Sequence, residues 1–435
     1  MTTPPPPRAP SPVATAPFHL MTKPIGSKCN LDCTYCFYLE KERLYGDAGN
    51  FRMTPEVLET YVRDYIAAQP GPTVSFAWQG GEPTLLGVEF FRQAVALQAR
   101  YANGKTIENA FQTNGVLLDD EWAQFFVQHG FLVGLSIDGP AHLHDAYRVD
   151  RGGRPAFDRV MTGLQLLKKH GVAFNTLTTV HRKNSAHALE VYRFLREIGS
   201  GYIQFIPIVE RNAATTSEET LWLAPPPDHE DAAALDAQVT PWSVRPAEYG
   251  DFLSRIFDEW VQHDVGRVFV QHFDAALANW MGQPAGICVF SANCGRALAV
   301  EHNGDVYSCD HYVYPRYKLG NLLNASLASL VDSPTQRAFG QAKSATLPRA
   351  CRECPVQFAC HGECPKHRFL RTPDGEPGLN YLCAGYKKFF LHVDSPMRTM
   401  AALLATRQPP AKIMQLPRAK WVPARLKRKS PAAPF

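Results

Sequence analysis

Apolar runs and helical patterns alternate regularly over the first half of the chain. Six short apolar runs end in polar or glycine residues, as buried strands do, and the intervals between them have the spacing of amphipathic helices. Repeated strand–helix units form parallel sheets, so six of them predict an α/β fold with a barrel-like sheet and a site at the carboxyl ends of its strands. The predicted strands lie near residues 18–24, 73–78, 106–112, 131–137, 172–180 and 202–208.

The alternation ends after the sixth predicted strand. Residues 210–240 contain a proline run and an acidic patch at 228–231, which predict an insertion or linker over the barrel mouth. Residues 246–260 place apolar side chains on one face of a helix that should close the barrel. From residue 286 cysteine, glycine and short loops predominate, which indicates a domain organised by metal more than by core packing. We therefore expect a disordered proline-rich arm at 1–17, a barrel at 18–240, a helical connection at 241–285, a cysteine-rich domain at 286–395 and a basic, disordered tail at 396–435.

Charge is concentrated at the end of the chain. The formal net charge is +4, yet residues 407–435 hold eight basic residues and no acid, so the rest of the chain is acidic overall. Such a tail could contact nucleic acid, but its prolines and small residues favour a solvated extension. No apolar run is long enough to span a membrane, and the N-terminal residues lack the pattern of a signal peptide. These features predict a cytoplasmic protein without a membrane or nucleic-acid partner.

Eleven cysteines in a large chain without an export signal indicate metal ligands or catalytic thiols rather than disulfides. Cys29, Cys33 and Cys36 share one loop directly after the first predicted strand. A four-iron, four-sulfur cluster needs four ligands, so a loop that offers three leaves one iron open to a ligand that is not protein. The alternatives are a zinc loop or a cluster completed by a distant cysteine, although zinc sites usually begin with a C-x2-C or C-x4-C pair.

The other eight cysteines lie between residues 288 and 383, enough for two sites of four ligands. Zinc also takes four thiolates in a tetrahedron, so composition alone leaves structural zinc and iron–sulfur clusters both open, and zinc would make a non-enzymatic binding module.

The spacing C-x3-C-x2-C, followed by Phe37 and Tyr38, resembles the radical S-adenosylmethionine superfamily. The resemblance implies a partial (β/α)6 TIM-like barrel in which the open iron binds the amino and carboxylate groups of S-adenosylmethionine. Cleavage of the sulfonium then releases a 5'-deoxyadenosyl radical that abstracts hydrogen from the substrate, and the cofactor supplies this chemistry while the protein directs it.

The same resemblance assigns cofactor contacts at the ends of the predicted strands. Residues 78–83 resemble the family's GGEP element, residues 112–115 and 135–139 match patterns after the third and fourth strands, and the serine and arginine would bind the methionine carboxylate. A plain turn is the alternative reading of each motif. The residues expected to contact the cofactor are Tyr35, Gly80, Gly81, Glu82, Asn114, Ser136 and Arg148.

The cysteine-rich region resembles the SPASM domain, which carries two auxiliary four-iron, four-sulfur clusters. With four protein ligands each, these clusters would support the fold and transfer electrons. Assigning the domain's ligands by the order of the cysteines, the resemblance implies that the first cluster is held by Cys288, Cys294, Cys309 and Cys364. The second would be held by Cys351, Cys354, Cys360 and Cys383.

From about residue 18 to residue 395 the chain resembles the anaerobic sulfatase-maturating enzymes, on the phrases at 33–40, 204–211 and 303–311. This implies oxidation of a cysteine or serine in an unfolded sulfatase polypeptide to Cα-formylglycine, with electrons from a donor such as flavodoxin or ferredoxin. It also implies that Asp310 is the base that deprotonates the target residue. Asp310 could instead only cap a turn or support the neighbouring ligand, and a related peptide modifier that forms crosslinks is the rival activity.

Overall fold

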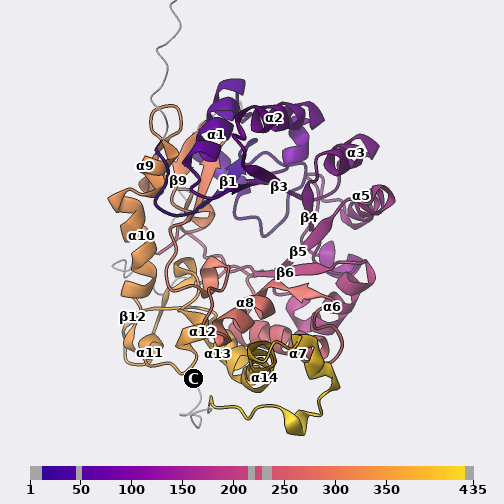
Figure 1. The fold of residues 1–435 in the computed structure, drawn as a ribbon, viewed down its shortest axis with the longest axis vertical. Helices are drawn as coiled ribbons and strands as arrows, with labels where there is room; N and C mark the ends of the chain where they lie inside the picture. The colour runs from indigo at the N-terminus through magenta and orange to yellow at the C-terminus, as the bar shows by residue number, and fades with distance from the viewer. Residues whose placement is uncertain (1–11, 46–50, 214–220, 228–237, 427–435) are drawn as a thin grey trace, which may run out of the picture.

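A curved ten-stranded sheet organises the computed structural model, which describes residues 12–45, 51–213, 221–227 and 238–426. The order of strands is β10-β9-β8-β1-β2-β3-β4-β5-β6-β7, and β1 to β7 pair in parallel. Helices lie along the outer side of the curved sheet (Figure 1). The predicted strand–helix barrel is confirmed, with strands β1 (His19–Lys23), β2 (Thr73–Trp78), β3 (Thr106–Thr113), β4 (Leu132–Ser136), β5 (Phe174–Val180) and β6 (Tyr202–Pro207). The helices between them are α1 (Pro55–Ala68), α2 (Val88–Tyr101), α3 (Asp120–Gln128), α4 (Ala141–His144), α5 (Phe157–His170) and α6 (Ala188–Glu197).

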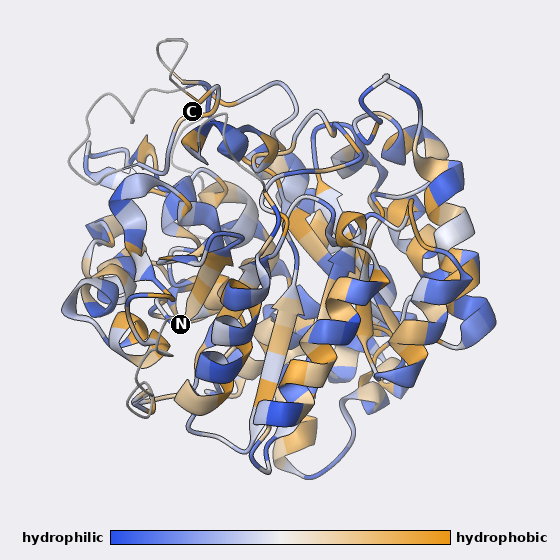
Figure 2. Cartoon of the chain, turned by 90° about the horizontal axis from the view of Figure 1, so that it is seen from above, coloured by the Kyte–Doolittle hydropathy of each residue, from blue (hydrophilic) through white to orange (hydrophobic). Residues whose placement is uncertain are grey.

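Local sequence signals set the ends of these helices. The Thr54 hydroxyl accepts the Val57 N–H at the start of α1, and the Asp119 carboxylate accepts the Trp122 N–H at the start of α3. Each contact satisfies a backbone donor that the helix itself leaves unpaired. In Figure 2 the hydrophobic strands occupy the centre, and the helices around them carry mixed polar and apolar faces. The helices therefore bury one face against the sheet and expose the other.

The sheet does not stop at the six predicted strands. A segment of the cysteine-rich region, β8 (Ala297–Glu301), pairs in parallel with β1, with His19 opposite Ala297 and Lys23 opposite Glu301. The antiparallel strands β9 (Asp305–Tyr307) and β10 (Lys318–Asn321) continue the sheet outward from β8. This pairing covers the edge of β1 and brings the cysteine-rich region against the first strand of the barrel. At the other edge, the two-residue β7 (Phe269–Val270) pairs with β6.

Helix α7 (Pro246–His263) packs on the barrel, against α6 and β6, with Phe252, Leu253, Ile256, Phe257 and Trp260 all buried. It packs against α13 (Cys383–His392) of the cysteine-rich region. The contact depends on a glycine in each helix, because a Cβ on Gly385 would lie 2.1 Å from the Pro246 carbonyl oxygen and a Cβ on Gly250 would lie 2.7 Å from the Gly385 carbonyl oxygen. Larger residues at either position would push the two helices apart.

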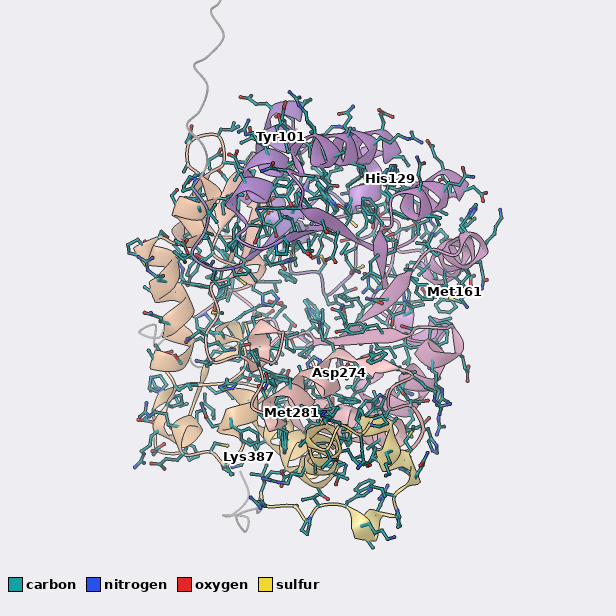
Figure 3. All side chains as sticks on the ribbon, in the orientation of Figure 1. Tyr101, His129, Met161, Asp274, Met281 and Lys387 are labelled. Carbon is teal, nitrogen blue, oxygen red and sulfur yellow. The ribbon has the colours of Figure 1, made fainter. Side chains whose placement is uncertain are left out.

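Two hydrophobic cores each combine barrel and cysteine-rich residues. One contains β4 to β6 and α7 together with α13, and the other contains β1 to β3 together with β8 and α9. Side chains fill the space between the sheet and its helices (Figure 3). The remaining helices are α8 (Gln271–Trp280), α9 (Leu327–Val331), α10 (Pro334–Ala345), α11 (Arg349–Arg352) and α12 (Gln357–Cys360), and a small second sheet pairs β11 (Leu370–Arg371) with β12 (Pro377–Leu379).

The C-terminal tail differs from its prediction. Residues 394–405 form helix α14 (Asp394–Ala405), which buries Met397 and Met400, and Ile413 beyond it is also buried. The Asp394 carboxylate accepts the backbone N–H groups of Arg425 and Leu426 at 2.7 and 2.9 Å, which fixes the chain up to residue 426. The expectation of disorder from residue 396 is therefore wrong for 396–426, because a few apolar positions dock on the core despite the basic composition; 427–435 lie outside the described residues.

The N-terminal arm is also ordered where it is described. Ala14 is buried and its N–H donates to the Ala68 carbonyl oxygen at 2.9 Å, while the Thr15 hydroxyl donates to Asp332 at 2.7 Å. The predicted disorder is thus wrong for residues 12–17, because Ala14 donates to the last residue of α1 and Thr15 donates to Asp332. Residues 1–11 lie outside the described part of the chain.

The predicted insertion folds back on itself where it is described. Isolated bridges pair Arg211 with Val239 and Asn212 with Leu223. The Glu40 carboxylate accepts the Trp222 N–H at 2.6 Å, so this segment lies beside the chain that follows the first cysteine loop. Residues 214–220 and 228–237, including the predicted acidic patch, lie outside the described residues. None of the helices within the described ranges has the length and apolar character needed to cross a membrane.

Candidate functional site

The first cysteine loop is fixed by the chain that follows β4. Asp32 donates its backbone N–H to the Val149 carbonyl oxygen at 2.8 Å, and Thr34 donates to Tyr147 at 2.9 Å. Burial raises the pKa of Cys29 and raises that of Cys33 to about 12, and the neighbouring thiols of the loop add to both shifts. Thiolates in such a place need a cation to stabilise them, which is what a metal cluster provides.

The eight other cysteines fall into two electrostatic groups. Besides burial, the charge of Cys288 raises the pKa of Cys294, Cys309 and Cys364. Cys351 in turn raises the pKa of Cys360 and Cys383, and Cys354 raises that of Cys351 and Cys383. This grouping is consistent with the two ligand sets expected from the order of the cysteines, and those sets stay predictions. Buried Arg368 lies between them, and its guanidinium donates to the carbonyl oxygens of Lys343, His361, Gly362 and Glu363.

The sulfur spacing favours a polynuclear cluster over a single zinc ion. One tetrahedral zinc holds its sulfur ligands about 3.8 Å apart, given a Zn–S bond of about 2.3 Å. Among the described residues, which include all eleven cysteines, no three cysteines have sulfur atoms that all lie within 4.8 Å of one another. The donor set therefore fits iron–sulfur clusters, whose larger core separates its ligands more widely.

The glycine pair after β2 lies directly against the cysteine loop. Gly81 donates to the Gly26 carbonyl oxygen at 2.7 Å, and a Cβ on Gly81 would lie only 1.9 Å from the Lys28 carbonyl oxygen. Gly80, with φ of 133°, has a backbone conformation that L side chains rarely adopt. The motif thus brings the end of β2 against the residues that precede Cys29.

Glu82 has a structural role that its motif did not predict. Its fully buried carboxylate accepts the Thr84 hydroxyl at 2.7 Å, the Thr113 hydroxyl at 2.8 Å and the Asn114 N–H at 2.8 Å. It therefore joins the ends of β2 and β3. The Asn114 amide donates to Asn30 at 2.7 Å and lies 3.8 Å from the Cys29 sulfur. Contacts of Glu82 and Asn114 with the cofactor stay predictions.

Asp138 gathers two of the predicted cofactor residues around itself. Arg148 Nε and Nη2 donate to its two oxygens at 2.8 and 3.1 Å, and the Tyr35 hydroxyl donates to Oδ2. The Thr179 N–H at the end of β5 donates to Oδ1 at 2.9 Å. Burial alone would raise the pKa of Asp138, but the Arg148 guanidinium, together with His181 and His144, outweighs burial and lowers it. Ser136, two residues earlier, accepts the Gln112 amide at 2.9 Å.

Sequence reasoning missed Asp138, although it lies inside the motif at 135–139. The resemblance assigned a role to Ser136 in this motif but none to Asp138. Nothing in the sequence shows that Arg148 forms an ion pair with Asp138. The fork that we expected to bind the methionine carboxylate is thus already engaged with Asp138.

Asp310 lies where the cysteine-rich region meets the barrel. It follows Cys309 at the start of a 3-10 turn (Asp310–Tyr312), and its carboxylate pairs with Lys23, the last residue of β1. Burial raises the pKa of Asp310, yet the Lys23 ammonium, together with His311 and Lys366, outweighs burial and lowers it. No motif in the sequence marks Lys23, which lies six residues before the first cysteine of the loop. The first cysteine loop, Gly80–Glu82 and Asn114 follow β1, β2 and β3, and Ser136 ends β4, so these predicted residues lie at the carboxyl ends of parallel strands, as a barrel site requires.

Comparison with known proteins agrees with this geometry. The radical SAM superfamily model matches residues 24–195, and a model of an iron–sulfur cluster-binding domain, SPASM, matches residues 292–355. S-adenosylmethionine and iron–sulfur clusters are therefore the cofactors of this chain.

Similar proteins of known activity align over nearly the whole chain. A serine-type anaerobic sulfatase-maturating enzyme of Bacteroides thetaiotaomicron is 48% identical, over 92% of this chain and 95% of its own length. A cysteine-type enzyme of Clostridium perfringens is 34% identical, over 86% of this chain and 95% of its own. The structure described as native anSMEcpe with bound AdoMet superposes with a TM-score of 0.76 at 32% identity. The superposition covers 89% of this chain and 100% of the related chain. The chain therefore belongs to the anaerobic sulfatase-maturating enzymes of the radical S-adenosylmethionine superfamily.

Proposed function

We propose that this enzyme oxidises a serine or cysteine side chain in an unfolded sulfatase polypeptide to Cα-formylglycine. Serine is the first candidate, because the serine-type relatives are 48% and 39% identical to this chain and the cysteine-type relative 34%. A related structure, native anSMEcpe with bound AdoMet and Cp18Cys peptide, supports a peptide as the form of the substrate.

The placement of Asp310 carries the proposal. The S-adenosylmethionine cofactor would supply the radical that abstracts a hydrogen atom from the β-carbon, and an auxiliary cluster would accept an electron. The aldehyde or thioaldehyde forms only when the hydroxyl or thiol also loses its proton, so a base must lie beside the electron acceptor. Asp310 is adjacent to Cys309, a proposed ligand of the first auxiliary cluster, and Lys23 holds its carboxylate in the ionised form.

The remaining site residues have proposed roles that follow from their positions. Cys29, Cys33 and Cys36 would hold the cluster that binds S-adenosylmethionine. Ser136 would face the cofactor's carboxylate, and Arg148, whose Nε and Nη2 pair with Asp138, would contribute its remaining positive charge. Cys288, Cys294, Cys309 and Cys364 would hold the first auxiliary cluster, and Cys351, Cys354, Cys360 and Cys383 the second. We also propose that the enzyme works in the cytoplasm, where a flavodoxin or ferredoxin supplies electrons.

Mass spectrometry of sulfatase-motif peptides tests the function. Peptides with serine, cysteine or alanine at the target position are incubated anaerobically with the enzyme, S-adenosylmethionine and a reductant. We expect the serine peptide to lose two hydrogens, the cysteine peptide to exchange its thiol for an aldehyde oxygen, and the alanine peptide to stay unchanged. Both products must react with an aldehyde-specific hydroxylamine probe. Loss of two hydrogens without that reactivity would indicate a crosslink and contradict the proposal.

A further inference from the structure

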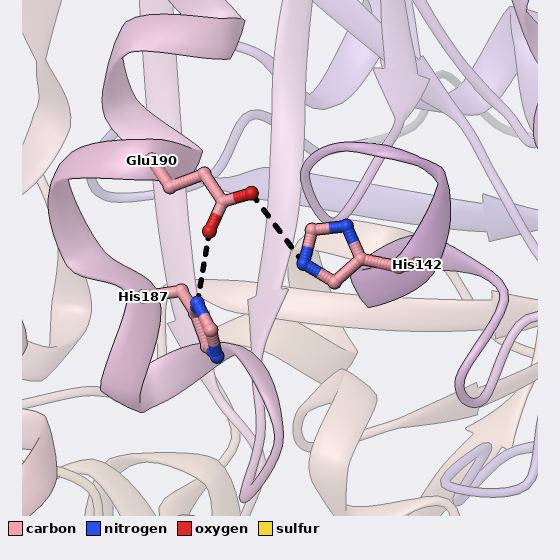
Figure 4. Close-up of side chains that lie close together, drawn as sticks. All are labelled: His142, His187 and Glu190. Carbon is pink, nitrogen blue, oxygen red and sulfur yellow. Dashed lines mark hydrogen bonds and ion pairs between the residues drawn. The ribbon is translucent and has the colours of Figure 1, made fainter.

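Two imidazoles and a carboxylate meet on the surface beyond the ends of β4 and β5 (Figure 4). His142 lies on α4, His187 ends the 3-10 helix at Asn184–His187, and Glu190 lies in the first turn of α6. His142 Nε2 is 3.4 Å from Glu190 Oε1, and His187 Nδ1 is 2.8 Å from Glu190 Oε2. The carboxylate thus lies between the two rings, whose centroids are 5.8 Å apart.

This arrangement has the donor set of a transition-metal site. Within the described residues it is the one group of three or more histidine, cysteine or acidic residues whose ligand atoms all lie within 4.8 Å of one another. Two imidazoles and one carboxylate are a known ligand set for zinc with an open coordination position. Imidazole also selects zinc, copper, iron or nickel over magnesium and calcium, which prefer oxygen. The side chains are 58%, 44% and 44% exposed for His142, His187 and Glu190, so water can reach an ion there and complete its coordination.

The position of the group gives such an ion a defined structural effect. His142 belongs to the loop that follows β4, and His187 and Glu190 belong to the segment that follows β5. The two loops already meet at Asn184, whose amide donates to the Asp138 carbonyl oxygen at 3.1 Å and to the Thr179 carbonyl oxygen at 2.9 Å. A bound ion would add a second link between the same loops, on the outer side of the Asp138 cluster.

We propose that His142, His187 and Glu190 form a binding site for a divalent transition-metal ion such as Zn²⁺, separate from the cysteine sites, and that the ion ties the β4 loop to the β5 loop. The ion has no part in the oxidation itself.

Zinc binding to the cluster-loaded enzyme tests the proposal. The protein must be free of a histidine tag, and its cysteines must hold iron, since free thiolates would also take zinc. After anaerobic equilibrium dialysis against zinc, elemental analysis should find one zinc per chain with no loss of iron. His142→Ala and His187→Ala should each weaken zinc binding at least about tenfold, because even residues that only support a metal ligand contribute about that much. Glu190→Gln, which keeps the size of the side chain, should do the same.

His392→Ala is the matched control, because His392 forms an imidazole–carboxylate pair with Asp258 but is in no three-ligand group. It should bind zinc as the wild type does. Zinc should raise the unfolding temperature of the wild type and this control but not of the three variants. The proposal is overturned if the wild type takes up no more zinc than His142→Ala, which is the result expected if the three side chains are only hydrogen-bonded. It is also overturned if zinc uptake is accompanied by an equal loss of iron.

Discussion

Lys23 and Asp310 form an ion pair across the junction between the barrel and the cysteine-rich region, with the side chains only 2% and 18% exposed. Lys23 ends β1, and Asp310 follows β9, which belongs to the same sheet through β8. The proposed base is therefore supplied by one region and held by the other. Neither region alone contains a complete site.

Lys23→Met should destabilise the protein and slow formylglycine formation. Removing the cation leaves a buried carboxylate without its partner, a loss typically worth about 3–5 kcal/mol. The partial exposure of Asp310 places the expected loss at the lower end of that range. The measurement is thermal unfolding under anaerobic conditions, paired with peptide turnover. Lys388→Met is the control, because Lys388 and Asp251 form an exposed pair, 44% and 52% accessible, that should contribute about 0–1 kcal/mol. Equal stability of the two variants would show that Lys23 and Asp310 are not coupled.

Arg148→Ala should have two separable effects, because Arg148 has a buried partner in addition to its proposed ligand. Loss of a charge-assisted contact should weaken S-adenosylmethionine binding by roughly ten- to a hundredfold. The Asp138 carboxylate, left buried and unpaired, should also lower the unfolding temperature. Iron content should not change.

The double variant Arg148→Ala/Asp138→Asn distinguishes the two effects. It removes the unpaired charge, so stability should largely return while cofactor affinity stays low. Recovery of both would mean that Arg148 acts on the cofactor only by holding the loop after β4.

The parts that sequence predicted well are those that depend on local pattern or spacing. Alternation of apolar runs located β1 to β6. The division of the eight later cysteines into two ligand sets stays a prediction. Pairings between distant segments were missed, including β8 with β1, Lys23 with Asp310 and Arg148 with Asp138. Such contacts depend on the register of folded strands, which no local pattern specifies. The folded helix α14 was not predicted, because the overall composition of residues 396–435 is basic. The few apolar residues that pack on the core, such as Met397 and Met400, do not change that average.

Stability should depend on pH through Asp274, a partly buried residue of α8 that Figure 3 labels. Burial raises its pKa from 3.8 to about 7 in the folded protein. The folded state therefore keeps a proton that the unfolded state loses, so this residue's effect on stability becomes less favourable as pH rises from about 4 to about 7. Asp274→Asn cannot ionise, so its stability relative to wild type should rise through this range by at most about 4 kcal/mol and then level off. Denaturant titrations at pH 5 and pH 8 measure the difference, and a constant difference would contradict the raised pKa.

Iron content should divide according to the three cysteine sets. The reconstituted wild type should hold about twelve irons, and the variant with alanine at Cys29, Cys33 and Cys36 should keep about eight while losing S-adenosylmethionine cleavage. Elemental analysis and anaerobic cleavage assays measure both quantities. About four irons in a well-reconstituted wild type, or zinc in place of the others, would refute the assignment of the eight cysteines beyond residue 286.

Asp310→Asn should uncouple cofactor cleavage from product formation. Hydrogen abstraction from the β-carbon does not itself require a base, whereas completing the aldehyde requires removal of the hydroxyl or thiol proton. The asparagine keeps the size of the side chain but cannot accept that proton, so formylglycine formation should fall by about 10² to 10⁴, the usual effect of losing a general base. Cleavage of S-adenosylmethionine should continue, and with a peptide deuterated at the target β-carbon the 5'-deoxyadenosine should still gain deuterium. Unchanged iron content would show that the cluster proposed to be held by neighbouring Cys309 is intact. Formylglycine formation at the wild-type rate would mean that Asp310 only supports the cluster and that the base is a different residue at the barrel mouth.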